Sequence, residues 1–373
     1  MNLGHICIDK LEHMQMPMKI LKAIPFHDGN ALVLSTDRNY MDYAIVAIQS
    51  WLDNASKPTN CIILTDENDW KGMQSYMESN LRIPSNSTLE VHCIADLVDL
   101  DELQLYEFGY LTKAMYYRLL IPAIMPDYGK VLYVDSDVCI ANPMEEIFDT
   151  EFEGDEIIGA VEDFETMKML PKGIKGMGCI PEELQKGLAN KYGNLREWYR
   201  REMDINPDDN PKYMNSGVCL FDIKKCNEYG FTDKCFDLIS KQMKANGWIL
   251  YPDQDVLNSV CKGRIKWLPH RWNALWCYAT KYALNIRLQR KSLQEEGEKY
   301  KESIENACLW HYLCGKPWNK PSLDYDMAMH WWKACQKTPL FEKHLSKLSK
   351  NVQAKILELL GEERKTPAID SFF

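Results

Sequence analysis

The segment Lys130-Val131-Leu132-Tyr133-Val134-Asp135-Ser136-Asp137-Val138 begins with an apolar run that has the length of a buried strand and then carries two carboxylates. Because side chains two residues apart project to the same side of an extended chain, Asp135 and Asp137 face the same way. Two carboxylates on one side repel each other unless a positive charge lies between them. A hard divalent cation with oxygen ligands meets that requirement. Many Asp-x-Asp sequences lie on surfaces by chance, but the position after a buried strand favours a metal site here.

Short apolar runs on both sides of this segment alternate with helical patterns. Residues 40–53 and 112–121 have the apolar period of helices. The runs that predict strands are residues 31–35, 61–65, 89–94, 130–134, 157–161 and 213–221. This alternation predicts an α/β fold with a mostly parallel, doubly wound sheet. Ligands of such sheets bind beyond the carboxyl ends of strands, so we expect a site just after Leu34 and Val134.

The pattern divides the chain into three parts. Residues 30–320 hold the alternating elements, and residues 1–29 form an N-terminal extension. Strand signals stop before residues 321–373, where residues 323–360 predict a C-terminal helical appendage. Leu323, Met327, Trp331 and Trp332 form an apolar stripe at helical spacing, which favours packing in a core over a platform for sugars.

Residues 165–212 interrupt the strand pattern. They are rich in glycine, proline and charge, with one helical stretch at residues 182–202. We interpret them as an insertion over the surface. Further helices are expected at residues 231–246 and 253–261.

Charge and cysteine usage restrict the partners and the compartment. The net charge is -10, whereas nucleic acid binding would favour a basic face, so nucleic acid is excluded as the main partner. No uncharged run approaches the ~20 residues that cross a bilayer, and residues 1–28 lack the apolar core of a signal peptide. The thirteen cysteines contain no CxxC pair, which favours buried free thiols. We therefore expect a cytoplasmic protein.

Five blocks of the sequence resemble glycosyltransferase family 8, and they follow one another in the expected order within residues 30–320. The blocks are Ser35-Thr36-Asp37-Arg38-Asn39-Tyr40, Tyr117-Arg118-Leu119-Leu120-Ile121-Pro122 with Lys130 to Val138, Tyr213-Met214-Asn215-Ser216-Gly217-Val218, Asp253-Gln254-Asp255-Val256-Leu257-Asn258, and His311 with Gly315-Lys316-Pro317-Trp318. This family includes bacterial lipopolysaccharide galactosyl- and glucosyltransferases and glycogenin. The resemblance implies a GT-A nucleotide-diphospho-sugar transferase fold, a UDP-sugar donor, Mn2+ or Mg2+, and retention of the anomeric configuration.

The resemblance also implies which residues hold the metal and the diphosphate. Asp135, Asp137 and His311 would be the metal ligands, although a lone histidine is more often structural. Lys316 would bring a positive charge to the diphosphate, and Gly315 would let the backbone approach it closely. Family members commonly have one more residue between this histidine and this lysine, so the geometry of the loop is open.

A second group of residues would hold the nucleoside, again by resemblance. Asp37 and Asn39 would supply hydrogen bonds to the uracil, and Tyr40 would stack on it. Asp135 would also reach the ribose, and Ser35 and Ser136 lie beside these positions. The alternative is that Asn39 caps a helix and Tyr40 faces the core.

A third group would surround the transferred sugar. Carboxylates and amides suit a ring of hydroxyls, each of which donates and accepts. The residues are Arg118, Asp163, Asn215, Ser216, Asp253 and Gln254, of which Gln254, Asp163 and Asp253 are assigned to catalysis. Gln254 matches the position beneath the anomeric carbon, and an amide is a poor nucleophile, so front-face attack by the acceptor fits better than a two-carboxylate scheme. The alternative for Asp253 is a cap of the helix that follows.

The sequence therefore predicts a hexosyltransferase that moves glucose or galactose from a UDP-sugar to a glycan or lipid-linked saccharide. One alternative is a sugar-nucleotide pyrophosphorylase, but residues 35–40 contain no glycine for a phosphate loop. Another is a nucleotide-sugar-binding protein without catalysis.

The insertion at residues 165–212 lies between Asp163 and Asn215, so we expect it to form part of the acceptor pocket. For the tail we favour packing against the catalytic domain over docking at the inner face of a membrane.

Overall fold

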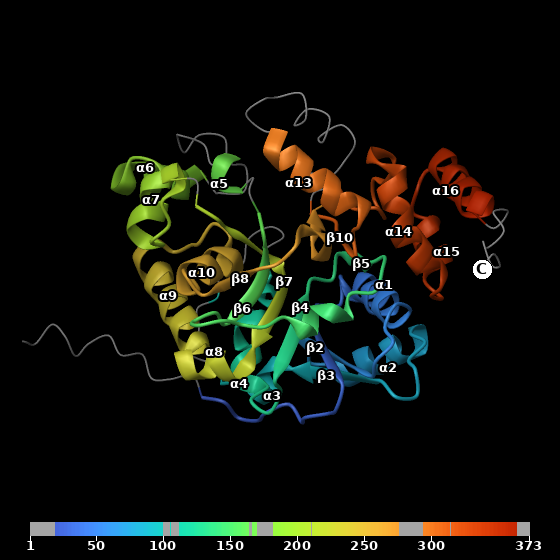
Figure 1. Cartoon of the computed structure of the whole chain (residues 1–373), viewed down its shortest axis with the longest axis horizontal. Coiled ribbons are helices and arrows are strands. Elements are labelled where there is room, and N and C mark those ends of the chain that lie inside the picture. The colour runs from blue at the N-terminus through green and yellow to red at the C-terminus, as the bar shows by residue number, and fades with distance from the viewer. Residues whose placement is uncertain are drawn as a thin grey trace, which may run out of the picture.

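The computed structural model describes residues 19–99, 105, 112–163, 166–169, 182–209, 211–275, 294–313 and 315–363. Within these residues a seven-stranded sheet in the order β3-β2-β1-β4-β7-β6-β8 has helices on both faces, and a separate sheet has three strands in the order β5-β10-β9 (Figure 1). The predicted α/β class is confirmed, and so is the mostly parallel, doubly wound sheet.

The first half of the large sheet is wholly parallel. β1 (Asn30–Ser35) pairs with β2 (Thr59–Thr65) on one side and with β4 (Lys130–Val134) on the other, and β2 pairs with β3 (Thr88–Cys93). The strands β1, β2 and β4 are buried along nearly their whole length, as expected where helices cover both faces of a sheet. The carboxyl ends of β1 and β4 therefore lie side by side.

The second half contains one reversed strand. β7 (Met214–Asp222) runs antiparallel to β4 and to β6 (Ile158–Glu162), and β8 (Ile265–Trp267) runs parallel to β6. Because Val134 pairs with Val218, the residues that begin β7 lie beside those that follow β4. Because β7 runs in the opposite direction, its first residues lie at the same edge of the sheet as the carboxyl ends of β1 and β4.

The small sheet was not predicted, since its strands have only two or three residues. β5 (Val138–Ile140) pairs antiparallel with β10 (Leu309–His311), which pairs parallel with β9 (Ala274–Leu275). His311 lies opposite Val138, and the backbone N–H of Tyr312 donates to the carbonyl of Asp137 at 3.0 Å. This pairing joins the residues around His311 to the segment that carries Asp135 and Asp137.

Two apolar clusters cover the two faces of the large sheet. Successive side chains of β4 alternate between them: Val131 and Tyr133 belong to one cluster, and Leu132 and Val134 to the other. The second of these faces is covered by α1 (Met41–Leu52) and α2 (Trp70–Asn80). The first is covered by η1 (Lys113–Leu120), α4 (Ile121–Ile124), α8 (Ile223–Tyr229), α9 (Phe231–Asn246) and α10 (Pro252–Val260).

The other helical elements are α3 (Ile94–Leu97), η2 (Glu145–Asp149), α5 (Thr166–Met169), α6 (Glu182–Tyr192), α7 (Leu195–Glu202), η3 (Pro207–Asp209), η4 (His270–Trp272), α13 (Gln294–Glu305) and η6 (Pro321–Leu323).

The predicted helix at residues 112–121 is mostly a 3-10 helix, η1, which α4 continues. Proline at position 122 has no N–H to give to the carbonyl of Arg118. Ile121 donates to that carbonyl instead, one residue earlier than an α-helix would. The prediction was right about a helical segment and wrong about its type.

The insertion at residues 165–212 is described in part, because residues 165, 170–181 and 210 lie outside the described ranges. Its predicted helix at residues 182–202 is two helices, α6 and α7. Gly193 separates them with a positive φ of 77°, and the Asn194 side chain accepts the Glu197 N–H at 2.9 Å to cap α7. The break therefore has a local cause in two residues.

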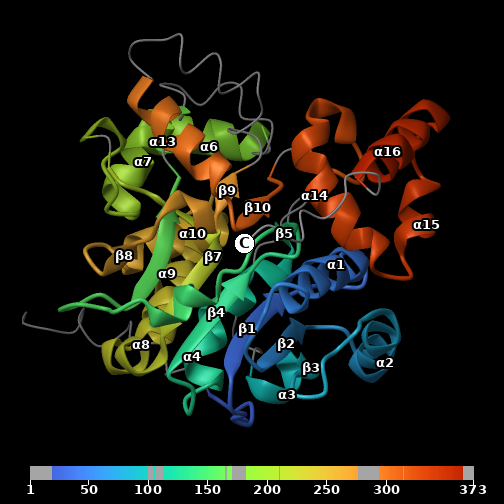
Figure 2. The same ribbon diagram turned by 45° about the vertical axis from the view of Figure 1, so that its right-hand side comes forward.

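The described residues of the tail contain three α-helices where the sequence predicted one helical stretch. They are α14 (Tyr325–Gln336), α15 (Phe341–Leu345) and α16 (Lys350–Glu363), and they lie together beside α1 (Figure 2). Pro339 follows the end of α14, and a proline cannot continue a helix without an N–H.

The helix α14 packs against the part of the chain that precedes the tail, as we favoured. Trp331 and Trp332 are fully buried, which confirms that they belong to a core. Trp332 Nε1 donates to the carbonyl of Pro317 at 3.1 Å, and the Tyr312 hydroxyl donates to the carbonyl of Met327 at 3.1 Å. Both bonds tie α14 to the segment that follows His311.

The cysteines of the described residues agree with the prediction of buried free thiols. Nine cysteines are described there, and all nine are free and buried. None of the helices in the described ranges has the length and apolarity that a membrane span needs.

A buried carboxyl connects the insertion to the sheet and to α10. Asp255 accepts the hydroxyl protons of Tyr199 at 2.9 Å and Tyr213 at 2.6 Å, and the backbone N–H of Tyr251 at 2.9 Å. Burial raises the pKa of Asp255 to about 7, against these hydrogen bonds, which lower it.

This pKa predicts a pH dependence of stability. An unfolded aspartate titrates near about 3.9, so between about pH 4 and 7 the folded chain holds this proton and the unfolded chain does not. The free energy of unfolding should therefore fall with rising pH in that window, by up to about 1.4 kcal/mol per unit from this group. Asp255→Asn should remove that slope in urea unfolding at about pH 5 and 8. The same drop in variant and wild type would contradict the assignment.

Candidate functional site

Three side chains that could hold a metal meet beyond the end of β4. Asp135 and Asp137 follow the strand, and His311 comes from β10. One ligand atom from each lies within 4.8 Å of the others, with His311 Nε2 at 3.3 Å from Asp137 Oδ1 and 3.7 Å from Asp135 Oδ2. The structure thus brings the three predicted metal ligands together.

The burial and hydrogen bonding of the His311 ring fit a metal ligand. The ring is 1% exposed, and its Nδ1 lies 3.0 Å from Asn273 Oδ1. The other nitrogen, Nε2, is buried without a hydrogen-bond partner among the described residues and faces two carboxylates. Leaving a buried polar atom unpartnered costs about 1–3 kcal/mol. Several other buried atoms of the described residues share this state, and Nε2 of His311 is distinguished by the two carboxylates that it faces. An imidazole and two carboxylates form a mixed nitrogen and oxygen donor set that suits Mn2+.

Lys316 is the nearest cation to this cluster. Its ammonium forms an ion pair with Asp137 and also donates to the carbonyl of Tyr312. Burial raises the pKa of Asp137, but Lys316 and His311 outweigh it and hold the pKa below its usual value. The loop from His311 to Lys316, although one residue shorter than is common in the family it resembles, still delivers the ammonium to the site. Cys314 of this loop lies outside the described residues.

Arg118 connects the metal cluster to the proposed sugar site. Its Nη2 donates to Asp135 Oδ1 at 2.7 Å, and its Nη1 lies 3.0 Å from Asp253 Oδ2. The same Nη1 donates to the carbonyl of Ser216 at 2.6 Å, and the guanidinium lies over the Tyr133 ring. Burial lowers the pKa of Arg118, but the two carboxylates raise it further, so the group stays charged. The predicted alternative for Asp253, a helix cap, is wrong, because α10 begins after Tyr251 and its N-cap makes no side-chain bond.

The amide residues form a connected group at the start of β7. Gln254 Oε1 accepts the backbone N–H of Ser216 at 3.0 Å and the side-chain amide of Asn215 at 3.3 Å. The other end of this amide, Nε2, lies 3.5 Å from Asp163 Oδ2. Asp163 also accepts the backbone N–H and the hydroxyl of Thr166, at 3.1 and 2.8 Å, and so anchors the start of the insertion. The predicted sugar residues are therefore adjacent to one another and to the first described residues of the insertion.

The predicted nucleoside residues follow β1. Asp37 Oδ1 accepts the backbone N–H of Tyr40 at 2.9 Å, and Asn39 Nδ2 lies 3.5 Å from the same carboxylate. Ser136 Oγ donates to the carbonyl of Ser35 at 3.2 Å, which ties this segment to the end of β4. The Tyr40 ring is 39% exposed, and Asn39 makes no cap for α1. The alternative in which Asn39 caps the helix and Tyr40 faces the core is therefore wrong.

Three residues at the site were missed as site residues. Gly217, within a motif that we quoted, lies against His311 and Asp135: a β-carbon on it would lie 2.2 Å from His311 Cε1. Tyr133 donates its hydroxyl proton to Asp135 Oδ1 at 2.9 Å. Asn273 contacts both His311 and Asn215, and no motif or spacing singled it out.

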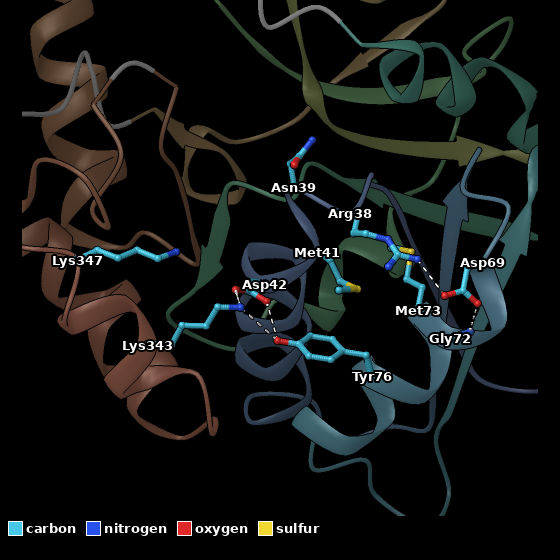
Figure 3. Close-up of a pocket in the computed structure, with 10 residues that line it drawn as sticks. All are labelled: Arg38, Asn39, Met41, Asp42, Asp69, Gly72, Met73, Tyr76, Lys343 and Lys347. Carbon is cyan, nitrogen blue, oxygen red and sulfur yellow. Dashed lines mark hydrogen bonds and ion pairs between the residues drawn. The ribbon is translucent and has the colours of Figure 1, made fainter.

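A pocket of about 510 Å³ lies near the segment that follows β1 (Figure 3). Asp135, Asp137, His311 and Gln254 do not line it. Figure 3 shows the Lys343 ammonium pointing at Asp42 and Tyr76, with 2.6 Å from Lys343 Nζ to Asp42 Oδ2. Two of its cations, Arg38 and Lys343, are thus already paired with carboxylates. We do not place the chemistry in this pocket.

The comparisons with known proteins agree with this geometry. A family model described as Glycosyl transferase family 8 matches residues 31–321. General stress protein A of Bacillus subtilis is 26% identical over 216 residues, which are 57% of this chain and 62% of that protein, so this chain spans less than two thirds of that relative. Lipopolysaccharide 1,2-glucosyltransferase of Escherichia coli K12 is 25% identical over 299 residues, which are 78% of this chain and 74% of the relative.

A solved structure supports the fold. The galactosyltransferase LgtC, in complex with donor and acceptor sugar analogs, matches with a TM-score of 0.59 at 19% identity, over 87% of this chain and 99% of that chain. At that identity the likeness is one of fold. The predicted GT-A fold is confirmed.

The position of Gly217 gives a direct test of the cluster. In Gly217→Ala the new β-carbon would also lie 2.6 Å from Asp135 Oδ2, so His311 and Asp135 must move apart. We expect a loss of stability of about 1–3 kcal/mol and at least roughly tenfold weaker Mn2+ binding in calorimetric titration. Gly129→Ala is the control, because a β-carbon there has no neighbour within 4 Å. Equal Mn2+ affinity in both variants would show that the cluster does not hold the metal.

Proposed function

This chain belongs to glycosyl transferase family 8, and from that premise we propose that it transfers a hexose, glucose or galactose, from a UDP-sugar to a saccharide acceptor. The transfer is metal-dependent and retains the anomeric configuration. The observation that carries the proposal is the buried Nε2 of His311, which has no hydrogen-bond partner among the described residues and faces Asp135 and Asp137. Lys316 and the amide group of Asn215 and Gln254 lie beside it.

In this proposal the segment after β1 binds the nucleoside. Asp37 and Asn39 supply the hydrogen bonds to the uracil, and Ser35 and Ser136 lie next to this segment, bonded to each other. The half-exposed ring of Tyr40 is open to stack on a base. Asp135 reaches the ribose. Support comes from the position of this segment beside the metal cluster, where Ser136 bonds to Ser35.

The cluster of Asp135, Asp137 and His311 would hold a divalent cation, Mn2+ or Mg2+. Such a cation, when bound, acts as a Lewis acid that neutralises charge on the departing UDP. Lys316 adds a positive charge at the same place, and Gly315 leaves room for the diphosphate. Because Lys316 is paired with Asp137, we infer that its ammonium turns from that carboxylate to the phosphates when the donor binds.

The sugar lies against Arg118, Asp163, Asn215, Ser216, Asp253 and Gln254. The oxygen of Gln254 accepts the Ser216 N–H and its Nε2 lies near Asp163, so both ends of this amide are held, and an amide is a poor nucleophile for attack on the anomeric carbon. We therefore propose front-face attack. The acceptor oxygen bonds to the anomeric carbon as the bond to the β-phosphate oxygen breaks, and that phosphate takes the acceptor proton. Asp163 and Asp253 orient the hydroxyls of the ring.

The acceptor is a glycan or a lipid-linked saccharide. The name of the Escherichia coli relative, a lipopolysaccharide glucosyltransferase, supports a bacterial cell-surface glycan. We assign residues 30–320 to the catalytic domain and residues 165–212 to the acceptor pocket, because Asp163 anchors the first residues of that insertion. Catalysis is placed in the cytoplasm, with no role for nucleic acid. Association with the inner face of the membrane stays the less favoured prediction.

The experiment measures free UDP released from UDP-glucose and UDP-galactose without acceptor, with and without Mn2+. Asp137→Asn keeps the shape of the side chain but loses the charge. We expect it to lower UDP release by roughly 100-fold or more, which corresponds to the several kcal/mol that a bound cation supplies. Asp127→Asn, on an exposed turn before β4, is the matched control and should behave as wild type.

Two outcomes would contradict the proposal. Full release in excess EDTA would exclude the metal site. Tight, Mn2+-dependent binding of UDP with no release from either donor, and no transfer to an added saccharide, would favour a nucleotide-sugar-binding protein without catalysis.

A further inference from the structure

A chain of buried amides runs from the metal cluster to the proposed sugar site. Asn273 is fully buried, with Oδ1 at 3.0 Å from His311 Nδ1 and Nδ2 at 2.8 Å from Asn215 Oδ1. Asn215 Nδ2 in turn lies 3.3 Å from Gln254 Oε1. The four side chains are therefore connected, and each of them is less than a tenth exposed.

Two backbone N–H groups determine which end of each side-chain amide is the oxygen and which is the NH2. The N–H of Gly217 lies 3.0 Å from Asn215, and because it can only donate, the atom it meets must be the oxygen of that amide. That oxygen can then receive only the NH2 of Asn273, so the oxygen of Asn273 faces His311. His311 therefore carries a proton on Nδ1, so in the neutral imidazole the lone pair of Nε2 is directed toward the carboxylates. The N–H of Ser216 fixes Gln254 in the same way.

The backbone holds Asn273 at this place. Its N–H donates to the carbonyl of His270 at 3.0 Å, and the residue is followed at once by β9. Within the small sheet, Leu275 of β9 lies opposite His311 of β10. The amide and the imidazole are thus positioned by adjacent, hydrogen-bonded strands.

We propose that Asn273 is a positioning residue with two separable tasks: it sets the tautomer and direction of His311 for the metal, and it holds Asn215 against Gln254 at the sugar site. This inference rests on the proposed function, since it assumes both sites. An asparagine suits both tasks because one end of its amide accepts and the other donates. An aspartate at this position could only accept.

The two tasks predict different results for two variants of the full chain. Asn273→Ala loses both contacts, and we expect Mn2+ affinity, measured by electron paramagnetic resonance of free Mn2+, to weaken by roughly 10- to 100-fold. Asn273→Asp keeps an oxygen for His311 but places a second oxygen against that of Asn215. We expect its Mn2+ affinity to stay within roughly threefold of wild type or to tighten, while kcat for UDP release falls by roughly tenfold or more.

Asn258 supplies the matched control. It is also a buried asparagine, 5% exposed, and it bonds to the backbone of Met214 and Gln254 without touching His311. Asn258→Ala should lose stability in the way of any buried amide but keep Mn2+ affinity within roughly threefold of wild type. A merely structural role for Asn273 would instead make both alanine variants alike in Mn2+ affinity and in Tm.

The outcomes separate this inference from the function on which it rests. If wild type neither binds Mn2+ nor releases UDP in its presence, the proposed function fails, and this inference with it. If wild type does both and Asn273→Ala binds Mn2+ equally well, the inference alone is overturned. The same holds if Asn273→Asp loses Mn2+ affinity as Asn273→Ala does, because the tautomer of His311 would then not depend on an acceptor at this position.

Discussion

The site depends on one backbone pairing, that of β10 with β5. This pairing sets His311 opposite Val138, the residue after Asp137, and the N–H of Tyr312 adds a bond to the carbonyl of Asp137. His311 is more than 170 positions away along the chain from the carboxylates that it faces, and this pairing brings them together in space. The helix α14, which follows β10, strengthens the arrangement. The Tyr312 hydroxyl donates to a carbonyl of α14, and the carbonyl of Pro317 accepts from the Trp332 indole of α14.

A concentration of charge at the end of β4 is stable because each carboxylate has a partner. Arg118 pairs with Asp135 and Asp253, and Lys316 pairs with Asp137. Removing one partner of a buried pair would leave an uncompensated charge, which is far more costly than the pair itself is stabilising. These pairs also leave one buried polar atom, Nε2 of His311, without a partner among the described residues. The charges and the orphaned nitrogen together define where a cation would lie.

Long periodic elements and local motifs were predictable, and non-local pairings were not. The sequence predicted β1, β2, β3, β4, β6 and β7 from short apolar stretches, which in β3 alternate with polar residues. It predicted the candidate metal ligands and the candidate sugar residues from family-like motifs, and the structure brings these side chains together. The strands β5, β9 and β10 are too short to leave a pattern, and the antiparallel direction of β7 follows from long-range pairing. Asn273 was not predicted for the same reason, because its contacts with His311 and Asn215 arise from the pairing of the small sheet.

We propose that His311, Asp135 and Asp137 hold a divalent cation, with Nε2 of the imidazole as the nitrogen ligand. Pulsed electron paramagnetic resonance of Mn2+ bound to the full chain tests this directly, because a coordinated imidazole nitrogen modulates the electron spin echo. We expect modulation from one 14N nucleus, which disappears in His311→Ala. Bound Mn2+ without nitrogen modulation, or with modulation that persists in that variant, would contradict it.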